Sequence, residues 1–258
     1  MSAVRLVRIA SSRCGPPTSA NGGWTAGLLA GLLLEHAGQL SGVPVTVTLR
    51  RPPPLDVDLP VRLTGDDARA TATLQGPPDD GNAEDAPPVA IAVLDQSAAV
   101  SPVSPVDVTT ATAAERRFTG LRDHPFPTCF VCGTARTAGD GLRLQPGRVD
   151  GGRTACTWTP HPNFSGRDGR TDPASVWAAL DCPGGWTTDL SGRPLVLGRM
   201  TALVHRQPAG GEQLVVVGRH LDTEGRKTRT ATTVYDAAGG IVGRADQLWI
   251  SVDPATFR

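Results

Sequence analysis

Asn21-Gly22-Gly23 is the turn best suited to chemistry, because it directly precedes a long apolar run that we expect to be helical. The first N–H groups of a helix have no partner within it and carry a partial positive charge, so they attract anions. Two glycines allow an incoming oxygen to approach these groups closely. We predict that this turn can stabilise an oxyanion. The simpler alternative is that Asn21 only caps the helix and the glycines only form the turn.

Asp181 is the acid best suited to act as a base. It follows the apolar residues 176–180, late in a short predicted helix. Burial in such surroundings disfavours the charged form and raises the pKa of a carboxyl group towards that of a useful general base. The alternative is an acid that caps the following Pro183-Gly184-Gly185 turn and has no chemical role.

Cys129 and Cys132 form a C-x-x-C pair, with His124, His161 and Cys156 in the same part of the chain. These residue types can hold zinc, but structural tetrahedral sites usually combine two such pairs, and only one is present. The pair does not open a helix that follows a strand, which disfavours a redox role. We expect no metal, and zinc binding by this pair stays open as the alternative.

Composition limits the classes of function. The chain has 258 residues, 39% of them hydrophobic, which is enough for a sizeable core in one large domain or two small ones. Its 25 basic and 25 acidic residues cancel, so neither nucleic acid nor a membrane surface is an expected partner. The longest apolar stretch, residues 24–34, is shorter than the roughly 20 residues that cross a bilayer. With no secretory signal and an odd number of cysteines, we expect reduced thiols and a cytoplasmic location.

The elements that must position these residues occur twice along the chain. In the first half, an extended segment at residues 4–10 precedes a helical stretch at 22–36. In the second half, extended segments from Leu142 and Arg153 precede a helical stretch at about 173–182. Four extended segments follow each helix, starting at Val43, Asp58, Ala68 and Val89 in one half and near Leu195, Gln213, Lys227 and Gly240 in the other.

One helix followed by four strands predicts an α+β protein rather than a doubly wound parallel sheet, which needs a crossover helix between strands. The expected unit is an antiparallel sheet around one long helix, present twice. We place the units at residues 1–95 and 118–258. Residues 96–117, rich in Ser, Pro, Thr and Ala, are typical of a linker. Residues 77–88 are predicted to form an exposed loop between two strands.

This order of elements resembles a double-hotdog protein of the acyl-CoA thioesterase superfamily. NGGW at residues 21–24 is similar to the helix start of the N-terminal hotdog in type II acyl-CoA thioesterases. CFVCG at 129–133, followed by GDGLRL at 139–144, resembles the opening segment of many PaaI-like thioesterases. WAALDCPGGW at 177–186 resembles the hotdog helix that carries the catalytic acid. The resemblance implies two tandem hotdog units, each an antiparallel β-sheet wrapped around a central helix.

The resemblance also implies roles for single residues. Asp181 matches the catalytic base or nucleophile, and Gln247 matches a catalytic glutamine on the last strand, unless it is an outward polar residue of an edge strand. Type II enzymes add a Thr or Ser on the first strand after the helix. Thr201 is the nearest candidate, although the alignment puts Leu197 at the matching place. Three tryptophans flank the expected site and are either acyl-pocket or core residues: Trp24, Trp177 and Trp186.

Comparing the two halves predicts the number of sites. In the family pattern the acid follows the helix start by about two turns. Nine residues after Asn21 stands Ala30, so the first helix lacks the acid. Nine residues before Asp181 stands Asp172, which no glycine pair follows. Because hotdog dimers build one site from amide donors and a carboxylate of opposite subunits, we predict one competent site per chain.

The predicted function is hydrolysis of an acyl thioester, with acyl-CoA or an acyl-carrier protein as partner. Asp181 would activate water or attack directly, Gly22 and Gly23 would form the oxyanion hole, and Gln247 would position water. No separate cofactor is expected, because CoA or phosphopantetheine arrives as part of the substrate. Candidate phosphate partners are Arg50, Arg51 and Arg206. The alternatives are a hydratase, a dehydratase or another thioester-processing enzyme, or a non-catalytic binding protein. Such proteins often pair further, as homo-oligomers.

Overall fold

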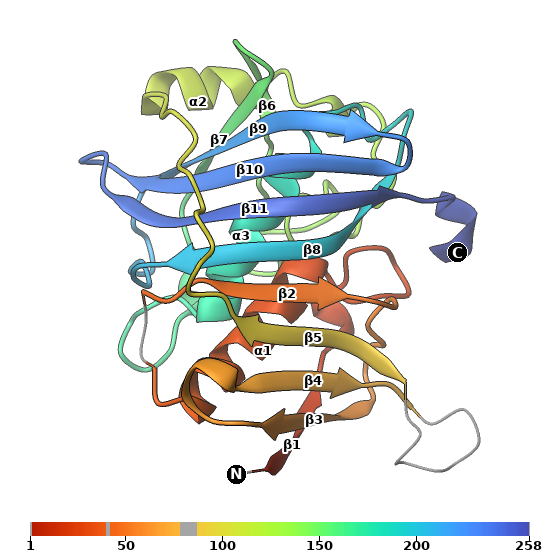
Figure 1. Cartoon of the computed structure of the whole chain (residues 1–258). Coiled ribbons are helices and arrows are strands. Elements are labelled where there is room, and N and C mark those ends of the chain that lie inside the picture. Colours follow the sequence, from red (N-terminus) through yellow and green to blue (C-terminus); the bar gives the residue numbers. More distant parts are fainter. Residues whose placement is uncertain (1, 40–41, 78–86, 258) are drawn as a thin grey trace.

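The structure, a computed structural model, describes residues 2–39, 42–77 and 87–257, so most of the predicted loop at 77–88 lies outside it. The described residues form one 11-stranded sheet in the order β1-β3-β4-β5-β2-β8-β11-β10-β9-β7-β6 (Figure 1). All neighbouring strands are antiparallel. This confirms the predicted α+β class. The elements are β1 (Ala3–Arg8), α1 (Gly22–His36), β2 (Val45–Leu49), β3 (Asp58–Thr64), β4 (Thr71–Gln75), β5 (Pro88–Leu94), α2 (Val108–Glu115), β6 (Gly147–Val149), β7 (Arg153–Trp158), α3 (Pro173–Gly185), β8 (Leu195–Val204), β9 (Leu214–Glu224), β10 (Lys227–Asp236) and β11 (Ile241–Ser251).

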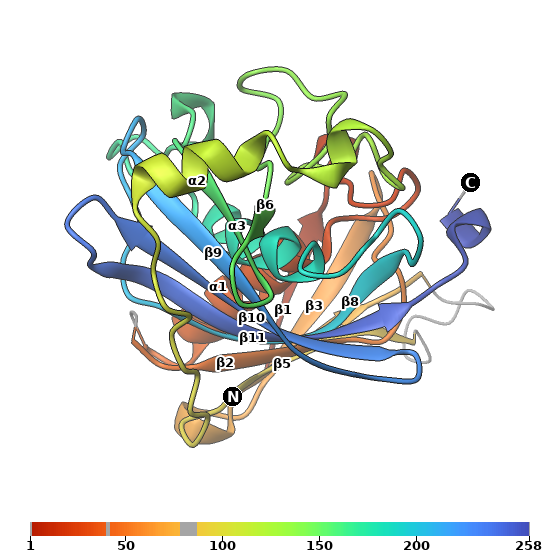
Figure 2. The same ribbon diagram turned by 90° about the horizontal axis from the view of Figure 1, so that it is seen from above.

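The two units join edge to edge at β2 and β8, where residues 45–48 pair with residues 199–202. Strands β1 to β5 lie on one side of this joint and β6 to β11 on the other, so each unit supplies half of the sheet. The sheet curves around α1 and α3, which lie side by side within it (Figure 2). The joint therefore brings the two central helices into contact.

Alternation decides which side chains of a strand enter the core. In β3, Leu59, Val61 and Leu63 are buried, whereas the residues between them are more exposed. Strand β7 is covered on both faces, by α3 on one and α2 on the other. Its Cys156 belongs to the main core, and the neighbouring Ala155 packs in a smaller core with α2.

The segment predicted as a linker, 96–117, contains the helix α2, which the sequence analysis did not predict. Asp107 caps α2, since its Oδ1 accepts a hydrogen bond from the Thr110 N–H at 2.7 Å. The Tyr235 hydroxyl donates to the Val103 carbonyl and ties the segment to β10. The segment is thus packed on the second unit over part of its length.

Both ends of α1 follow from local sequence. Asn21 Oδ1 accepts a hydrogen bond from the Trp24 N–H at 2.8 Å and so caps the start of the helix. Gly38 follows the helix with a φ of 66°, a left-handed conformation that glycine adopts without strain. The helix spans the same residues, Gly22–His36, as the sequence predicted.

Helix α3 begins at Pro173, whose fixed φ suits the first helical position. Asp172 caps it, because its Oδ1 accepts a hydrogen bond from the Ala174 N–H at 3.0 Å. The helix continues past its predicted end to Gly185, although Pro183 cannot donate a backbone hydrogen bond. Apart from Pro173, all of α3 is buried.

Glycines let α1 and α3 approach closely. A Cβ atom on Gly27 would lie 2.7 Å from both Ala174 Cα and Trp177 Cβ. A Cβ atom on Gly23 would lie 2.5 Å from Asp181 Cβ. Because Gly23 meets the later part of α3 and Gly27 the earlier part, the two helices run antiparallel. Any larger side chain at either glycine would force the helices apart.

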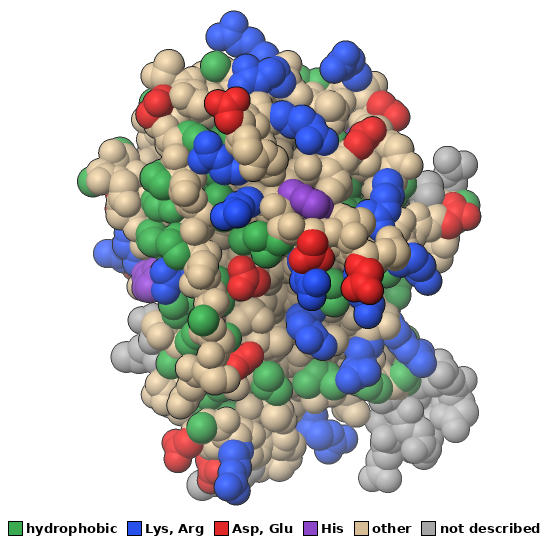
Figure 3. All heavy atoms as spheres, turned by 45° about the horizontal axis from the view of Figure 1, so that its top comes forward, with side chains coloured by type: hydrophobic (Ala, Val, Ile, Leu, Met, Phe, Trp, Pro, Cys, Tyr) green, Lys and Arg blue, Asp and Glu red, His purple; other side chains and the backbone are tan. Residues whose placement is uncertain are grey.

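The surface carries charges of both signs. Figure 3 shows basic and acidic side chains interspersed on the face that it presents, in keeping with a formal net charge of zero. Within the described ranges, no helix has both the length and the apolar character needed to cross a membrane.

Candidate active site

Asn21 links the start of α1 to Asp181 of α3. While its Oδ1 caps α1, its Nδ2 donates a hydrogen bond to Asp181 Oδ2 at 2.9 Å. The Gly23 N–H donates to the same carboxylate oxygen at 3.0 Å. Capping the helix and building a site were alternatives from the sequence, and Asn21 has the contacts for both. The structure therefore brings together the glycine turn and the acid.

Asp181 is a buried carboxyl group with one oxygen left over. Its side chain is 1% exposed, and no described residue bonds to Oδ1. Burial raises the pKa of Asp181 to about 7, against the opposing hydrogen bonds from Gly23 and Asn21, and nearby Cys129 adds to the rise. A group with a pKa near neutrality can both accept and return a proton.

The two glycines of the turn have different surroundings. The Gly23 N–H is occupied by Asp181. The Gly22 N–H stands at the first helical position, where it has no partner within the helix, and no acceptor in the described ranges bonds to it. A Cβ atom on Gly22 would lie 2.8 Å from Leu197 Cβ, so glycine keeps the turn close to β8. One amide thus holds the acid and the other remains for a ligand.

A cavity of about 830 Å³ opens beside these groups. Both units line it, so it is a site between the halves rather than within one of them. The walls are mainly apolar, with a few polar and charged groups at defined places. The lining residues include Asn21, Gly22, Leu49, Arg50, Arg51, Pro53, His124, Phe126, Cys129, Cys132, Asp181, Cys182, Trp186, Leu195, Leu197, Arg226 and Trp249.

Only one of the three predicted pocket tryptophans lines the cavity. Trp186 does so, and its ring packs edge-on against Phe118, with ring centres 4.6 Å apart. Trp177 instead lies at the α1–α3 contact under Gly27. Trp24 is partly buried and packs against the core without reaching the cavity. For Trp24 and Trp177 the structure thus favours the core interpretation.

Gln247 is buried, and its amide is fully engaged within the protein. Nε2 donates to the Leu180 carbonyl at 2.6 Å and to Thr232 Oγ1 at 2.9 Å. Oε1 accepts a hydrogen bond from Thr230 Oγ1 at 2.7 Å. Gln247 lies on β11 and bonds to the carbonyl of Leu180, the residue before Asp181, so it anchors α3 to the sheet. It does not line the cavity. The structure therefore does not bring this predicted catalytic residue to the substrate space.

Thr201 also lies away from the site. Its Oγ1 is 2.7 Å from Thr46 Oγ1, on the face of the sheet opposite the helices. A bulge at Gly198 is the reason, since the pairing of β8 with β11 skips this residue. Before the bulge Leu197 faces the cavity, and after it Met200 faces the helices. The apolar Leu197 thus stands where the type II pattern has a hydroxyl.

The predicted phosphate partners separate into two groups. Arg50 and Arg51 are exposed and line the cavity. Arg206 is committed elsewhere, because it forms ion pairs with Glu212 at 2.6 Å and Asp236 at 3.0 Å. Arg226, which sequence reasoning missed, is a third exposed arginine of the cavity lining.

His124 is a cavity residue that the sequence indicated only as a zinc candidate. Its Nδ1 accepts a hydrogen bond from the Phe126 N–H at 3.0 Å, and its Nε2 lies 3.1 Å from the Cys132 carbonyl. These contacts fit a neutral ring with the proton on Nε2. Burial lowers the pKa of His124, which also favours the neutral form.

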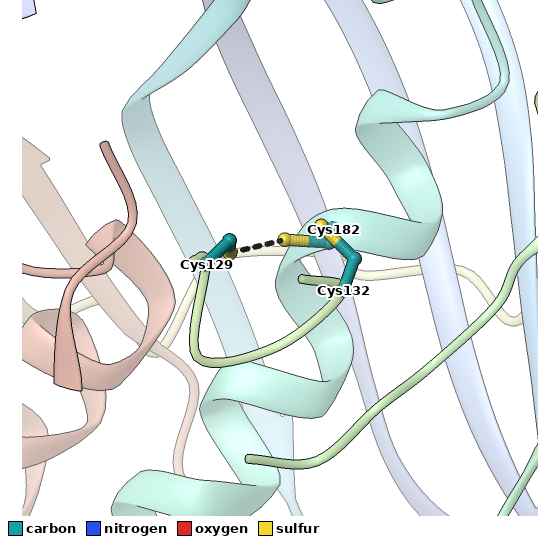
Figure 4. A group of neighbouring side chains, drawn as sticks. All are labelled: Cys129, Cys132 and Cys182. Carbon is teal, nitrogen blue, oxygen red and sulfur yellow. Dashed lines mark hydrogen bonds between the residues drawn. The ribbon is translucent and has the colours of Figure 1, made fainter. Parts of the chain in front are cut away.

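Three buried cysteines stand beside Asp181. The Sγ atoms of Cys129, Cys132 and Cys182 lie within 4.8 Å of one another (Figure 4). Interaction with the other two thiols lowers the pKa of Cys129. Sequence reasoning missed Cys182, although it directly follows the predicted catalytic acid. His161 and Cys156, which the sequence grouped with the C-x-x-C pair, are not part of the cluster.

No protein-family model and no curated protein matches the chain. Solved structures do match over nearly its whole length. A protein with a hot dog fold from Alicyclobacillus acidocaldarius is 15% identical, with a TM-score of 0.59 over 98% of this chain and 94% of its own. A putative thioesterase from Novosphingobium aromaticivorans is 14% identical, with a TM-score of 0.62 over 97% and 96% of the two chains.

A third similar structure is an N-terminal dehydratase from the difficidin assembly line, which is 12% identical. Its TM-score is 0.64 over 99% of this chain and 95% of its own. Likeness at such identities establishes the fold and leaves the chemistry to the site. The protein thus has the hotdog fold in two tandem units, as its sequence resemblance implied.

Proposed function

We propose that this double-hotdog protein hydrolyses an acyl thioester at one site between its two halves. The observation that carries the proposal is the meeting of Asp181 with Asn21 and Gly23 across the α1–α3 contact, beside a cavity able to hold a substrate. Likeness to a structure described as a putative thioesterase supports the same chemical class.

The Gly22 N–H polarises the thioester carbonyl. It projects from the start of α1, where the helix dipole adds a partial positive charge. During attack the carbonyl oxygen gains negative charge, so a hydrogen bond to it is stronger in the transition state than in the ground state. The donor is fixed by the helix and needs no rearrangement when charge develops.

Asp181 acts as the base. Asn21 and Gly23 hold its Oδ2, which leaves Oδ1 to accept a proton from water. The water oxygen attacks the carbonyl carbon, the C–S bond breaks, and Asp181 passes the proton to the leaving thiolate. A carboxylic acid and a thiol result, and Asp181 returns to its charged form. The pKa of about 7 suits both proton transfers.

The arginines of the cavity lining supply the polar end of the substrate site. Arg50, Arg51 and Arg226 are exposed and could pair with the phosphates of CoA or of a phosphopantetheine arm. The apolar walls, including Leu195 and Trp249, would then receive the acyl group. On this basis the partner that we propose is acyl-CoA or an acyl-carrier protein.

Thiol release from short, medium, long and aromatic acyl-CoAs tests the proposal, with carrier-protein thioesters as a second panel. The wild type is expected to release thiol from at least one class, and Asp181→Asn is expected to bind the same substrate without releasing thiol. An enzyme-only blank corrects for the five cysteines of the chain. Substrate binding without release by the wild type would contradict hydrolysis and favour a binding protein.

Dehydration of a 3-hydroxyacyl thioester is the second candidate, because His124 and Asp181 line one cavity and the fold is similar to that of a dehydratase. Backbone groups engage both ring nitrogens of His124, which favours hydrolysis. Formation of an enoyl thioester from a 3-hydroxyacyl-CoA, without thiol release, would reverse this preference.

A further inference from the structure

The cluster of Cys129, Cys132 and Cys182 joins two parts of the chain. Cys129 and Cys132 lie on one loop, and Cys182 projects from α3 towards them (Figure 4). The three side chains are 4%, 4% and 8% exposed, and their sulfur atoms all lie within 4.8 Å of one another. All three also line the cavity.

The spacing of these sulfur atoms matches that of thiolate ligands around one ion. A Zn–S bond of about 2.3 Å in a tetrahedron places neighbouring sulfur atoms about 3.8 Å apart. Cys129 Sγ and Cys182 Sγ are 3.8 Å apart. The Cys132 sulfur needs to move by no more than about 1 Å to complete such a face, since no pair of sulfurs exceeds 4.8 Å.

We propose that Cys129, Cys132 and Cys182 bind one zinc-class ion through three thiolates, with its fourth position on the cavity side. In the part of the chain that the structure describes, no fourth Cys, His, Asp or Glu joins the group, so water or a small thiol would complete the coordination. Three protein ligands with one open position is the arrangement of accessible zinc sites.

The surroundings suit such a site. The Asn21 amide nitrogen lies 4.0 Å from Cys129 Sγ, where it can donate to a thiolate ligand. A disulfide would use only two of the three sulfur atoms and leave the third without a role. The inference concerns metal binding alone and does not depend on the proposed hydrolysis. It differs from the sequence-based expectation of no metal, because Cys182 adds a third ligand to the two that the C-x-x-C pair supplies.

Metal content and cobalt substitution test the proposal on the full chain. Protein purified without chelator is expected to carry one zinc ion per chain by inductively coupled plasma mass spectrometry. After removal of the metal, Co²⁺ alone is expected to give a sulfur-to-cobalt charge-transfer band that saturates at one equivalent. Cys182→Ala and Cys132→Ala should each lose tight binding of one ion and weaken that band.

Cys156→Ala is the matched control, because it removes another buried cysteine outside the cluster and should retain one ion per chain. Folded wild-type protein that gives no cobalt–thiolate band would overturn the proposal. The proposal would also be overturned if both cluster variants gave a cobalt–thiolate band as strong as that of the wild type. A disulfide between two cluster cysteines in protein handled under argon would overturn it as well. Should a variant fail to fold, the wild-type metal content and cobalt titration still decide the question.

Discussion

The start of α1 and the start of α3 occupy equivalent places in the two hotdog units, yet they differ in every group that the proposed chemistry needs. At α1, Asn21 is followed by two glycines. Gly22 lines the cavity, and its N–H has no acceptor among the described residues. At α3, Asp172 is followed by Pro173, which has no N–H to donate. The next amide, that of Ala174, is already bonded to the Asp172 carboxylate.

The acid positions show the reverse difference. Asp181 of α3 faces the α1 turn, whereas the equivalent residue of α1 is Ala30, which is buried and has no polar side chain. Each unit therefore supplies one component of the proposed site and lacks the other. Because both units lie in one chain, selection needs to preserve only one complete site, and the structure supports one proposed centre per chain.

The largest effect is expected when the two acids of α3, Asp181 and its N-cap Asp172, are each replaced by asparagine. Asp181→Asn keeps the size of the side chain but removes the base, so thioester hydrolysis should fall by roughly 10²- to 10⁴-fold. Asp172→Asn is the matched control, since asparagine also caps helices, and its rate should stay within about twofold of wild type. Steady-state thiol release from both variants checks this. Equal losses in the two would remove the distinction between the sites.

The next effect concerns stability and its dependence on pH. Burial raises the pKa of Asp181 to about 7 from the ordinary aspartate value of 3.8. Between these values the native state binds a proton that the unfolded state has released, so stability falls as pH rises. This loss of unfolding free energy is complete above the pKa of Asp181 in the native state, and it amounts to at most about 4 kcal/mol.

Asp181→Asn removes this penalty. In metal-free protein, its stability relative to wild type should therefore rise from pH 4 to pH 8, as measured by urea unfolding. A difference that stays constant over this range would show that Asp181 is not held in an environment that opposes its charge.

Two glycines of α1 give a smaller but well-controlled contrast. Gly23→Ala would place a Cβ atom 2.5 Å from Asp181 Cβ, so we expect a loss of about 1–3 kcal/mol together with reduced hydrolysis. A Cβ atom on Gly31, on the exposed face of the same helix, would meet no atom within 4 Å. Gly31→Ala should therefore stabilise the protein by about 0.5–1 kcal/mol. Urea unfolding of both variants measures this, and a stable, fully active Gly23→Ala would argue against the tight α1–α3 contact.

The smallest effect is expected at Thr201, on the outer face of the sheet. Thr201→Val removes the hydroxyl that pairs with Thr46 and should cost about 0.5–1.5 kcal/mol of stability. Its hydrolysis rate should remain within about twofold of wild type. A loss of rate comparable to that of Asp181→Asn would instead assign Thr201 to the catalytic machinery.

Much of the framework could be predicted because it depends on local signals. The cap at Asn21 and the apolar run after it define α1, and strict alternation defines strands such as β3. The repeat of these signals predicted two units. The meeting of Asp181 with the glycine turn could be expected from the family pattern, but not from spacing alone, since the two lie on different helices.

What could not be predicted depends on tertiary structure. The bulge at Gly198 reverses which residues of β8 face inward, and a single skipped residue moves Thr201 to the opposite face of the sheet. Cys182 joins Cys129 across 53 residues of sequence, a distance at which no local spacing signals a shared site. Gln247 shows polar character whether it binds substrate or anchors α3, so only its contacts distinguish the two.

Binding stoichiometry tests the central claim of one site per chain most directly. Isothermal titration would use a non-hydrolysable ketone analogue of whichever acyl thioester the release assays identify. We predict one analogue bound per chain, with binding weakened in Gly23→Ala and unchanged in Asp172→Asn. Two equivalent analogues bound per chain would contradict the account, because the start of α3 would then also form a working site.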